Sequence, residues 1–143
     1  MRRLPRAVVM LVLVAACDEA NRTGPSPVTS TDALIAALRT RGATVSRGEV
    51  LPQSSNPFLS ANAQLLVVNG ANVSVFEYPS VAAAASDAAK VSPDRCSVGT
   101  TIITWVGPPH FYKSGRLIVL YAGTSDAVVM PLESVLGPPF ARC

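Results

Sequence analysis

The sequence predicts an α+β domain, with a mainly antiparallel sheet of four or five strands and about three helices packed largely on one face. Two patterns predict it: three segments carry helix caps or apolar residues at helical spacing, and five short apolar runs have the length of strands. A third observation is the Asn69-Gly70 pair between two of those runs, which is a strong hairpin signal.

The first predicted helix covers residues 30–42. Ser30 or Thr31 can cap its start, and Gly42 can end it. Leu34, Ile35 and Leu38 share one face. A short, weak strand over 43–50 follows, and then a loop over 51–61 that contains two prolines.

The best-marked part of the sheet is a hairpin of residues 64–68 and 71–78. In a two-residue turn Leu66 faces Val73 and Val68 faces Ala71. Four side chains then line the buried side: Leu66, Val68, Val73 and Val75. Leu65, Val67 and Phe76 fall on the opposite side, where a second layer or a partner must cover them.

The second half of the chain predicts two helices and a second strand pair. Residues 80–91 form an alanine-rich helix that Ser80 can cap. Strands over 101–106 and 116–122 are expected to pair, with 107–115 as the loop between them. Ser125 and Asp126 begin a last helix that ends near Gly137, and Pro131 should kink it or start its regular part.

The N-terminus has the layout of a secretory signal. Three arginines precede an apolar run over 7–16, which ends in Val14-Ala15-Ala16-Cys17. The cysteine after Ala-Ala resembles the lipobox of bacterial lipoproteins. That resemblance implies a signal peptide over 1–16 and a lipid on Cys17 that holds the protein on the cell membrane or outer membrane, outside the cytoplasm.

Two alternatives compete with the lipoprotein interpretation. A transmembrane anchor needs about 20 apolar residues, twice the length of the run over 7–16. An ordinary secretory signal cut after Ala16 leaves Cys17 as a free thiol. Under the lipoprotein interpretation, residues 17–29 are the lipidated cysteine and a polar tether, 30–140 form a single domain, and 141–143 are a C-terminal tail.

Charge argues against one class of partner. Three of the 12 basic residues lie within 1–16, so the remaining chain has nine basic and nine acidic residues. No basic stripe is left, and we therefore expect no binding to nucleic acid. The expected partners are the membrane, through the lipid on Cys17, and an envelope protein, a peptide or a glycan.

The domain also resembles a family of short bacterial lipoproteins of uncharacterised function. The resemblance rests on VFEY at 75–78, SPD…GT at 92–100 and W-x-x-PPHFY-x-x-GRLIVLY at 105–121, and it covers most of 31–140. It implies an envelope location and nothing about chemistry. Cys96 departs from the family pattern, which has a small or polar residue there.

Few residues could carry chemistry. Cys96 and Cys143 can form a disulfide in an oxidising compartment, and the alternative is two unpaired thiols. His110 is the only histidine, so we expect no metal site and no cofactor. A Cys96–His110 nucleophile and base, oriented by Asp94, has no supporting local motif.

The strongest binding candidate is the aromatic segment that follows the predicted strand over 101–106. Its residues are Trp105, Pro108, Pro109, His110, Phe111 and Tyr112. Prolines stiffen the backbone and aromatic rings provide contact area, although a plain hairpin connection would show the same residues. The sequence thus favours a non-catalytic binding module and leaves open a small envelope hydrolase or redox enzyme that uses Cys96 and His110.

Overall fold

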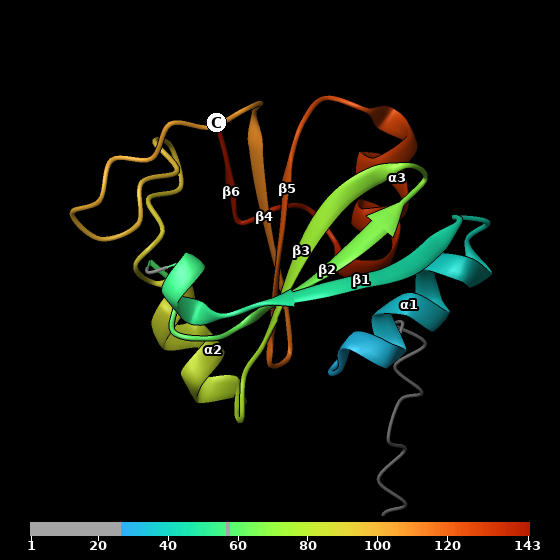
Figure 1. The fold of residues 1–143 in the computed structure, drawn as a ribbon, viewed down its shortest axis with the longest axis horizontal. Helices are drawn as coiled ribbons and strands as arrows, with labels where there is room; N and C mark the ends of the chain where they lie inside the picture. Colours follow the sequence, from blue (N-terminus) through green and yellow to red (C-terminus); the bar gives the residue numbers. More distant parts are fainter. Residues whose placement is uncertain (1–26, 57) are drawn as a thin grey trace, which may run out of the picture.

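The computed structural model describes residues 27–56 and 58–143 (Figure 1). The predicted signal, Cys17 and most of the tether lie outside the described residues. The helices are α1 (Thr31–Thr40), α2 (Val81–Ala88), α3 (Asp126–Leu136) and the short 3-10 helix η1 (Gln53–Ser55). The strands are β1 (Val45–Leu51), β2 (Ala63–Val68), β3 (Ala71–Glu77), β4 (Pro109–Ser114), β5 (Leu117–Ala122) and β6 (Ala141–Arg142).

All six strands belong to one antiparallel sheet with the order β1-β2-β3-β5-β4-β6. The predicted α+β class is therefore confirmed, and the predicted number of four or five strands is too low by at least one. The additional strand is β6, whose two residues are too few to give a periodic signal in the sequence.

One face of the sheet packs against α1 and α3. Leu34 and Leu38 of α1 are fully buried, as are Val128 and Leu132 of α3. The strands contribute every second residue to this core, including Val73 and Val75 of β3. Of the two predicted caps of α1, Ser30 is the one that acts, because its hydroxyl oxygen accepts a hydrogen bond from the amide of Ala33 at 3.1 Å.

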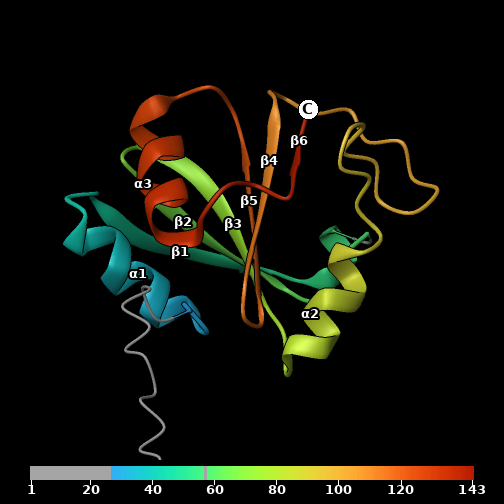
Figure 2. The same cartoon turned by 180° about the vertical axis from the view of Figure 1, so that it is seen from behind.

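The opposite face has its own core, covered by α2 and the segment over 89–105. Phe76, Phe111 and Ile118 from three neighbouring strands are fully buried there, under Ala84 of α2. Figures 1 and 2 show α2 apart from the α1–α3 layer. Two of the three α-helices therefore lie on one face and α2 lies on the other, because the strands carry apolar residues on both sides and each side needs a cover.

The β2–β3 hairpin has the predicted turn and register. Val68 pairs with Ala71 and Leu66 with Val73 across the turn. Asn69 and Gly70 have φ angles of 48° and 86°, the left-handed region that such a turn requires. The four predicted core side chains of this hairpin are all fully buried.

The second hairpin differs from the prediction. Residues 101–106 lie outside the sheet, and the strand that pairs with β5 is β4, in the segment predicted as a loop. Ser114 pairs with Leu117, so the turn consists of Gly115 and Arg116, with Gly115 at φ 54°. This register buries Phe111 in one core and Tyr112 in the other, which the predicted register would not do.

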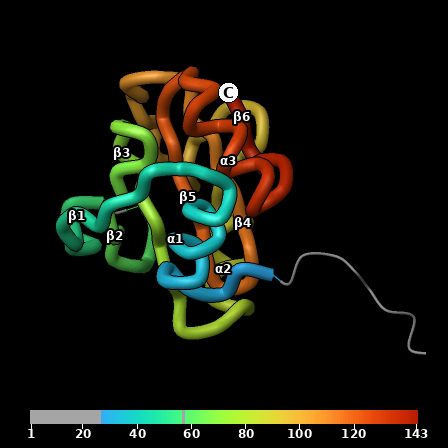
Figure 3. The backbone as a smooth tube through the Cα atoms, turned by 90° about the vertical axis from the view of Figure 1, so that its right-hand side faces the viewer, coloured from blue at the N-terminus to red at the C-terminus, as the bar shows by residue number. Residues whose placement is uncertain are grey.

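Both ends of the domain extend beyond the predicted limits. The predicted tail over 141–143 is not a tail: β6, which lies at the C-terminus (Figure 3), pairs with β4, and Ala141 is opposite Phe111 in the register. At the other end, Val28 is buried and the carbonyl of Thr29 accepts a hydrogen bond from Arg116 at 3.0 Å. The last predicted tether residues are therefore packed on the domain.

Candidate functional site

The aromatic segment predicted as a binding loop is a central part of the fold. Pro109, His110, Phe111 and Tyr112 form the buried first part of β4, and only Pro108 before it is exposed. The rings alternate between the two cores because side chains of a strand alternate between its faces. A ligand therefore cannot reach Phe111 or Tyr112 without opening the core.

His110 is held in place by its neighbours. The residue is 6% exposed, and its ring stacks with those of Tyr112 and Tyr121 at centroid distances of 6.5 and 6.0 Å. Its Nδ1 is 3.1 Å from the carbonyl oxygen of Pro108, and since a carbonyl only accepts, Nδ1 carries the proton. This environment is that of a packed side chain on the sheet.

Cys96 and Cys143 form a disulfide, with their Cα atoms 6.0 Å apart. Cys96 is fully buried in the second core. A sulfur in a disulfide is not a thiolate and cannot act as a nucleophile toward a substrate. The Cys96–His110 arrangement considered from the sequence therefore has neither a free thiol nor an accessible base.

The most exposed apolar side chains lie just before β4. We call residues 99–107 the display loop. Ile102 is 93% exposed and Val106 is 98% exposed, more than Val50, Val81 and Met130, the other exposed large apolar residues of the described chain. The loop extends from the sheet at the end of the molecule opposite α1 (Figures 1 and 2).

Both ends of the display loop are fixed to the domain. At its start, the amide of Gly99 donates a hydrogen bond to the carbonyl of Lys90 at 2.9 Å. At its end, Gly107 packs against the backbone of Gly123, where a Cβ on Gly107 would lie 3.2 Å from the Cα of Gly123. The amide of Gly123 also donates to the carbonyl of Pro108 at 2.9 Å. The display loop is thus attached to the domain at both of its ends.

The underside of the display loop packs on the second core. Trp105 meets Phe111 edge-on at a centroid distance of 5.6 Å and Phe58 at 6.3 Å. Ile103 is also half-buried against this core. Exposure therefore alternates along the loop, with Ile103 and Trp105 turned inward and Ile102 and Val106 turned outward. Trp105 thus anchors the display loop to the second core.

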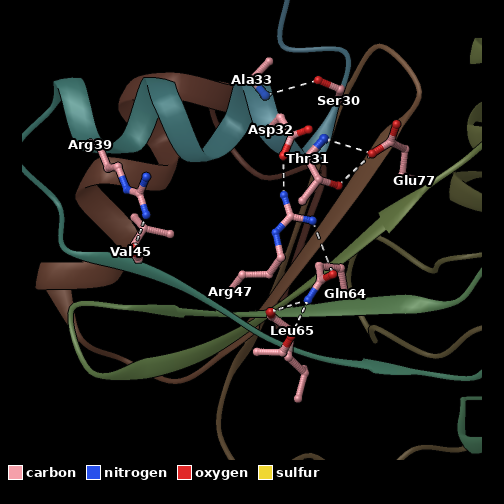
Figure 4. A network of polar contacts seen from close by, with 11 residues as sticks. Ser30, Thr31, Asp32, Ala33, Arg39, Val45, Arg47, Gln64, Leu65 and Glu77 are labelled. Atoms are coloured by element: carbon pink, nitrogen blue, oxygen red, sulfur yellow. Dashed lines mark hydrogen bonds and ion pairs between the residues drawn. The ribbon is translucent and has the colours of Figure 1, made fainter.

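A group of polar side chains lies in a hollow between the start of α1 and the strands β1 to β3 (Figure 4). Glu77 accepts hydrogen bonds from the amide and hydroxyl of Thr31 at 2.9 and 2.7 Å, and it pairs with Arg116 at 2.8 Å. Arg47 pairs with Asp32 across the same hollow. These groups satisfy one another, so the region joins α1 to the sheet.

The electrostatics of Glu77 agree with this structural role. Burial raises its pKa, but the two hydrogen bonds from Thr31 and the charges of Arg116 and Arg47 outweigh burial and lower the pKa below 4.5. A carboxylate at this helix start also interacts favourably with the helix dipole. Glu77 is therefore a deprotonated carboxylate that holds the start of α1 against the sheet, and it is not suited to donate a proton.

Over residues 27–56 and 58–143, no three histidine, cysteine or acidic side chains lie together as a metal ion would require. The helices of the same residues include none with the length and apolar character of a membrane span. Comparisons with protein families, curated proteins and solved structures found no match to this chain. The resemblance to short bacterial lipoproteins therefore stays a prediction.

Sequence reasoning missed the display loop, apart from Trp105. The segment over 101–106 has the composition of a strand, because its isoleucines, threonines, tryptophan and valine are all residues that favour strands. A signal was present in the two prolines at 108 and 109, which restrict the backbone before β4. Because β5 can pair with only one strand on that side, β4 leaves 101–106 outside the sheet.

Proposed function

We propose that this chain is a lipid-anchored envelope protein that works as a non-catalytic interaction module, with the display loop as its contact surface. The anchor is the lipid expected on Cys17. The contact surface is supported by the exposure of Ile102 and Val106 on a loop that is fixed at both ends.

That exposure is the observation that carries the proposal. Exposed apolar residues are common singly, but two of them on one short loop that is fixed at both ends are typical of a binding loop. A fixed loop loses little conformational freedom when a partner binds, so more of the contact free energy remains as affinity. The two fixed ends of the display loop provide this advantage.

The chemistry of the display loop favours a protein or peptide over a glycan. From Ser97 to Pro109 the chain has no charged side chain, and the outward residues are aliphatic or threonine. The aromatic ring of the loop, Trp105, is turned inward onto Phe111. An aliphatic surface without an exposed ring suits the apolar side chains of a protein partner.

The alternative of a hydrolase or redox enzyme that uses Cys96 and His110 is not favoured. Cys96 is bonded to Cys143 and fully buried, and His110 is buried against two tyrosines. Nucleophilic catalysis needs both groups free and within reach of a substrate.

Photo-crosslinking in bacteria tests the proposed contact surface. A photoreactive amino acid at Ile102 should give a covalent adduct of the full-length protein, and the same amino acid at Val81 should not. Val81 is the matched control, because it is an exposed apolar residue on a regular helix. If position 102 gives no adduct, or the same adducts as position 81, the display loop is not the contact surface.

A further inference from the structure

The outer part of the display loop has the character of a strand without a neighbour. Among the described residues, no hydrogen bond involves the backbone of Ile102 through Val106. Its sequence, IITWV, is rich in the β-branched and aromatic residues that favour strands. The alternation of exposed and half-buried side chains is also that of a strand. Its backbone donors and acceptors are thus open to a second strand.

We propose that residues 102–106 pair in antiparallel fashion with the same segment of a second copy of this chain. The inference rests on the proposed function and names the partner of the display loop. Strand addition of this kind gives affinity through main-chain hydrogen bonds and specificity through alternate side chains.

The order of the outward side chains is self-complementary. With a twofold axis at Thr104, Ile102 lies opposite Val106 of the partner subunit, and Val106 lies opposite Ile102 of the partner subunit. Thr104 then lies opposite its own copy. Aliphatic pairs and threonine pairs across antiparallel strands are both favourable, and a twofold interface must pair its residues reciprocally in this way.

Charge also permits this pairing at the display loop and opposes it at the long free edge of the sheet. No charged side chain lies between Arg95 and Lys113, so two copies of the segment meet without repulsion between like charges. The β1 edge carries Arg47 and Glu49 and an irregularity between Arg47 and Val50. Charges and bulges of this kind protect an edge from pairing.

The size of the contact explains why the membrane matters. Two five-residue strands bury less than the roughly 1,200 Å² at the lower end of stable protein interfaces. The pairing is therefore weak between copies that diffuse freely in solution. A lipid anchor confines the copies to one surface and raises their effective concentration, which can make a weak contact persist.

Crosslinking between two tagged copies tests the inference. Full-length chains with two different epitope tags are co-expressed in bacteria, each with a photoreactive amino acid at Thr104. We expect a covalent adduct of twice the chain mass that contains both tags, and none with the photoreactive amino acid at Val81. An adduct with a different protein and a single tag would overturn self-pairing and leave the proposed function standing. No adduct from either position 102 or position 104 would overturn both.

Charge variants test the register in the same cells. In Ile102→Lys/Val106→Glu, each lysine lies opposite a glutamate of the other copy, so the adduct with both tags should be retained. In Ile102→Lys/Val106→Lys, like charges face each other twice, and the yield should fall by roughly tenfold. Both variants change only exposed side chains. An equal loss in the two variants would show that the strands do not pair in this register.

Discussion

At the scale of single residues, two buried tyrosines differ in what their hydroxyl groups contact. The Tyr78 hydroxyl donates to the carboxylate of Asp87 at 2.8 Å. The Tyr112 hydroxyl is buried without a partner among the described residues. Burial, with the charge of Glu133, raises the pKa of Tyr112 to about 12. Both rings are packed in a core, so the two hydroxyls can be compared directly.

We expect opposite effects when each hydroxyl is removed. Tyr112→Phe should leave the free energy of unfolding unchanged or raise it, because a buried polar group without a partner costs about 1–3 kcal/mol. Tyr78→Phe should lower it by about 1–3 kcal/mol, because a hydrogen bond to a buried carboxylate is lost. Urea denaturation of both variants at neutral pH measures the difference. A clear loss in Tyr112→Phe would mean that its hydroxyl has a partner.

Asp87 links α2 to the loop before β2. It is 2% exposed and accepts hydrogen bonds from the amide and hydroxyl of Ser60 at 2.6 and 2.7 Å, and from Lys90 at 2.6 Å. Burial raises the pKa of Asp87, but the hydrogen bonds from Lys90, Ser60 and Tyr78 outweigh it and lower the pKa to about 2.

This shift predicts a stability that depends on pH. The pKa of Asp87 in the folded chain is below its ordinary 3.8, so its contribution is complete above pH 3.8 and is lost as the pH falls toward 2. The loss should be roughly 2 kcal/mol. Asp87→Asn should be less stable than the unchanged protein at pH 7. Between pH 4 and pH 2 it should lose less stability than the unchanged protein does. Glu77→Gln is the control, because Glu77 also has a lowered pKa. This variant should keep the loss of stability between pH 4 and pH 2 that comes from Asp87.

At the scale of elements, the disulfide secures the C-terminal strand. β6 has two residues, and the amides of Arg142 and Cys143 make only long hydrogen bonds of 3.4 Å to Pro93 and Pro109. The bond between Cys96 and Cys143 therefore holds β6 beside β4. It also ties the chain just before the display loop to the sheet.

Removing this bond should loosen the end of the chain. Closing a loop of this length stabilises a protein by about 4 kcal/mol in the chain-entropy model, and measured values of about 2–4 kcal/mol are typical. We expect Cys96→Ala/Cys143→Ser to lower the free energy of unfolding within that range. Amide hydrogen exchange should rise in β6 and at Gly99, while α1 keeps its protection. Unchanged exchange at both places would mean that packing alone fixes β6.

At the scale of the whole molecule, the proposed location on a membrane can be tested at Cys17. Full-length protein expressed in a bacterium should enter the detergent phase of a phase-separating detergent, and Cys17→Ser should stay in the aqueous phase. This expectation follows from the proposed lipid on Cys17, because the apolar run over 7–16 is too short to span a bilayer by itself. If the serine variant still enters the detergent phase with its first sixteen residues intact, the segment is a membrane anchor.

Local patterns in the sequence were enough for several parts of the fold. Ser30 as the cap of α1, the Asn69-Gly70 turn and the buried face of the β2–β3 hairpin all follow from neighbouring residues. Each depends on contacts within a few residues along the chain, or on a register that one turn fixes. These are the interactions that a single sequence can specify.

The choice between 101–106 and 109–114 as the partner of β5 was decided by the tertiary structure. Both segments have the composition of a strand, but only β4 places Phe111 in one core and Tyr112 in the other. The same choice leaves Ile102 and Val106 exposed, and it moves the candidate site from the aromatic residues to the display loop. Sequence patterns indicate which residues are apolar, whereas packing between distant elements decides which of them remain uncovered.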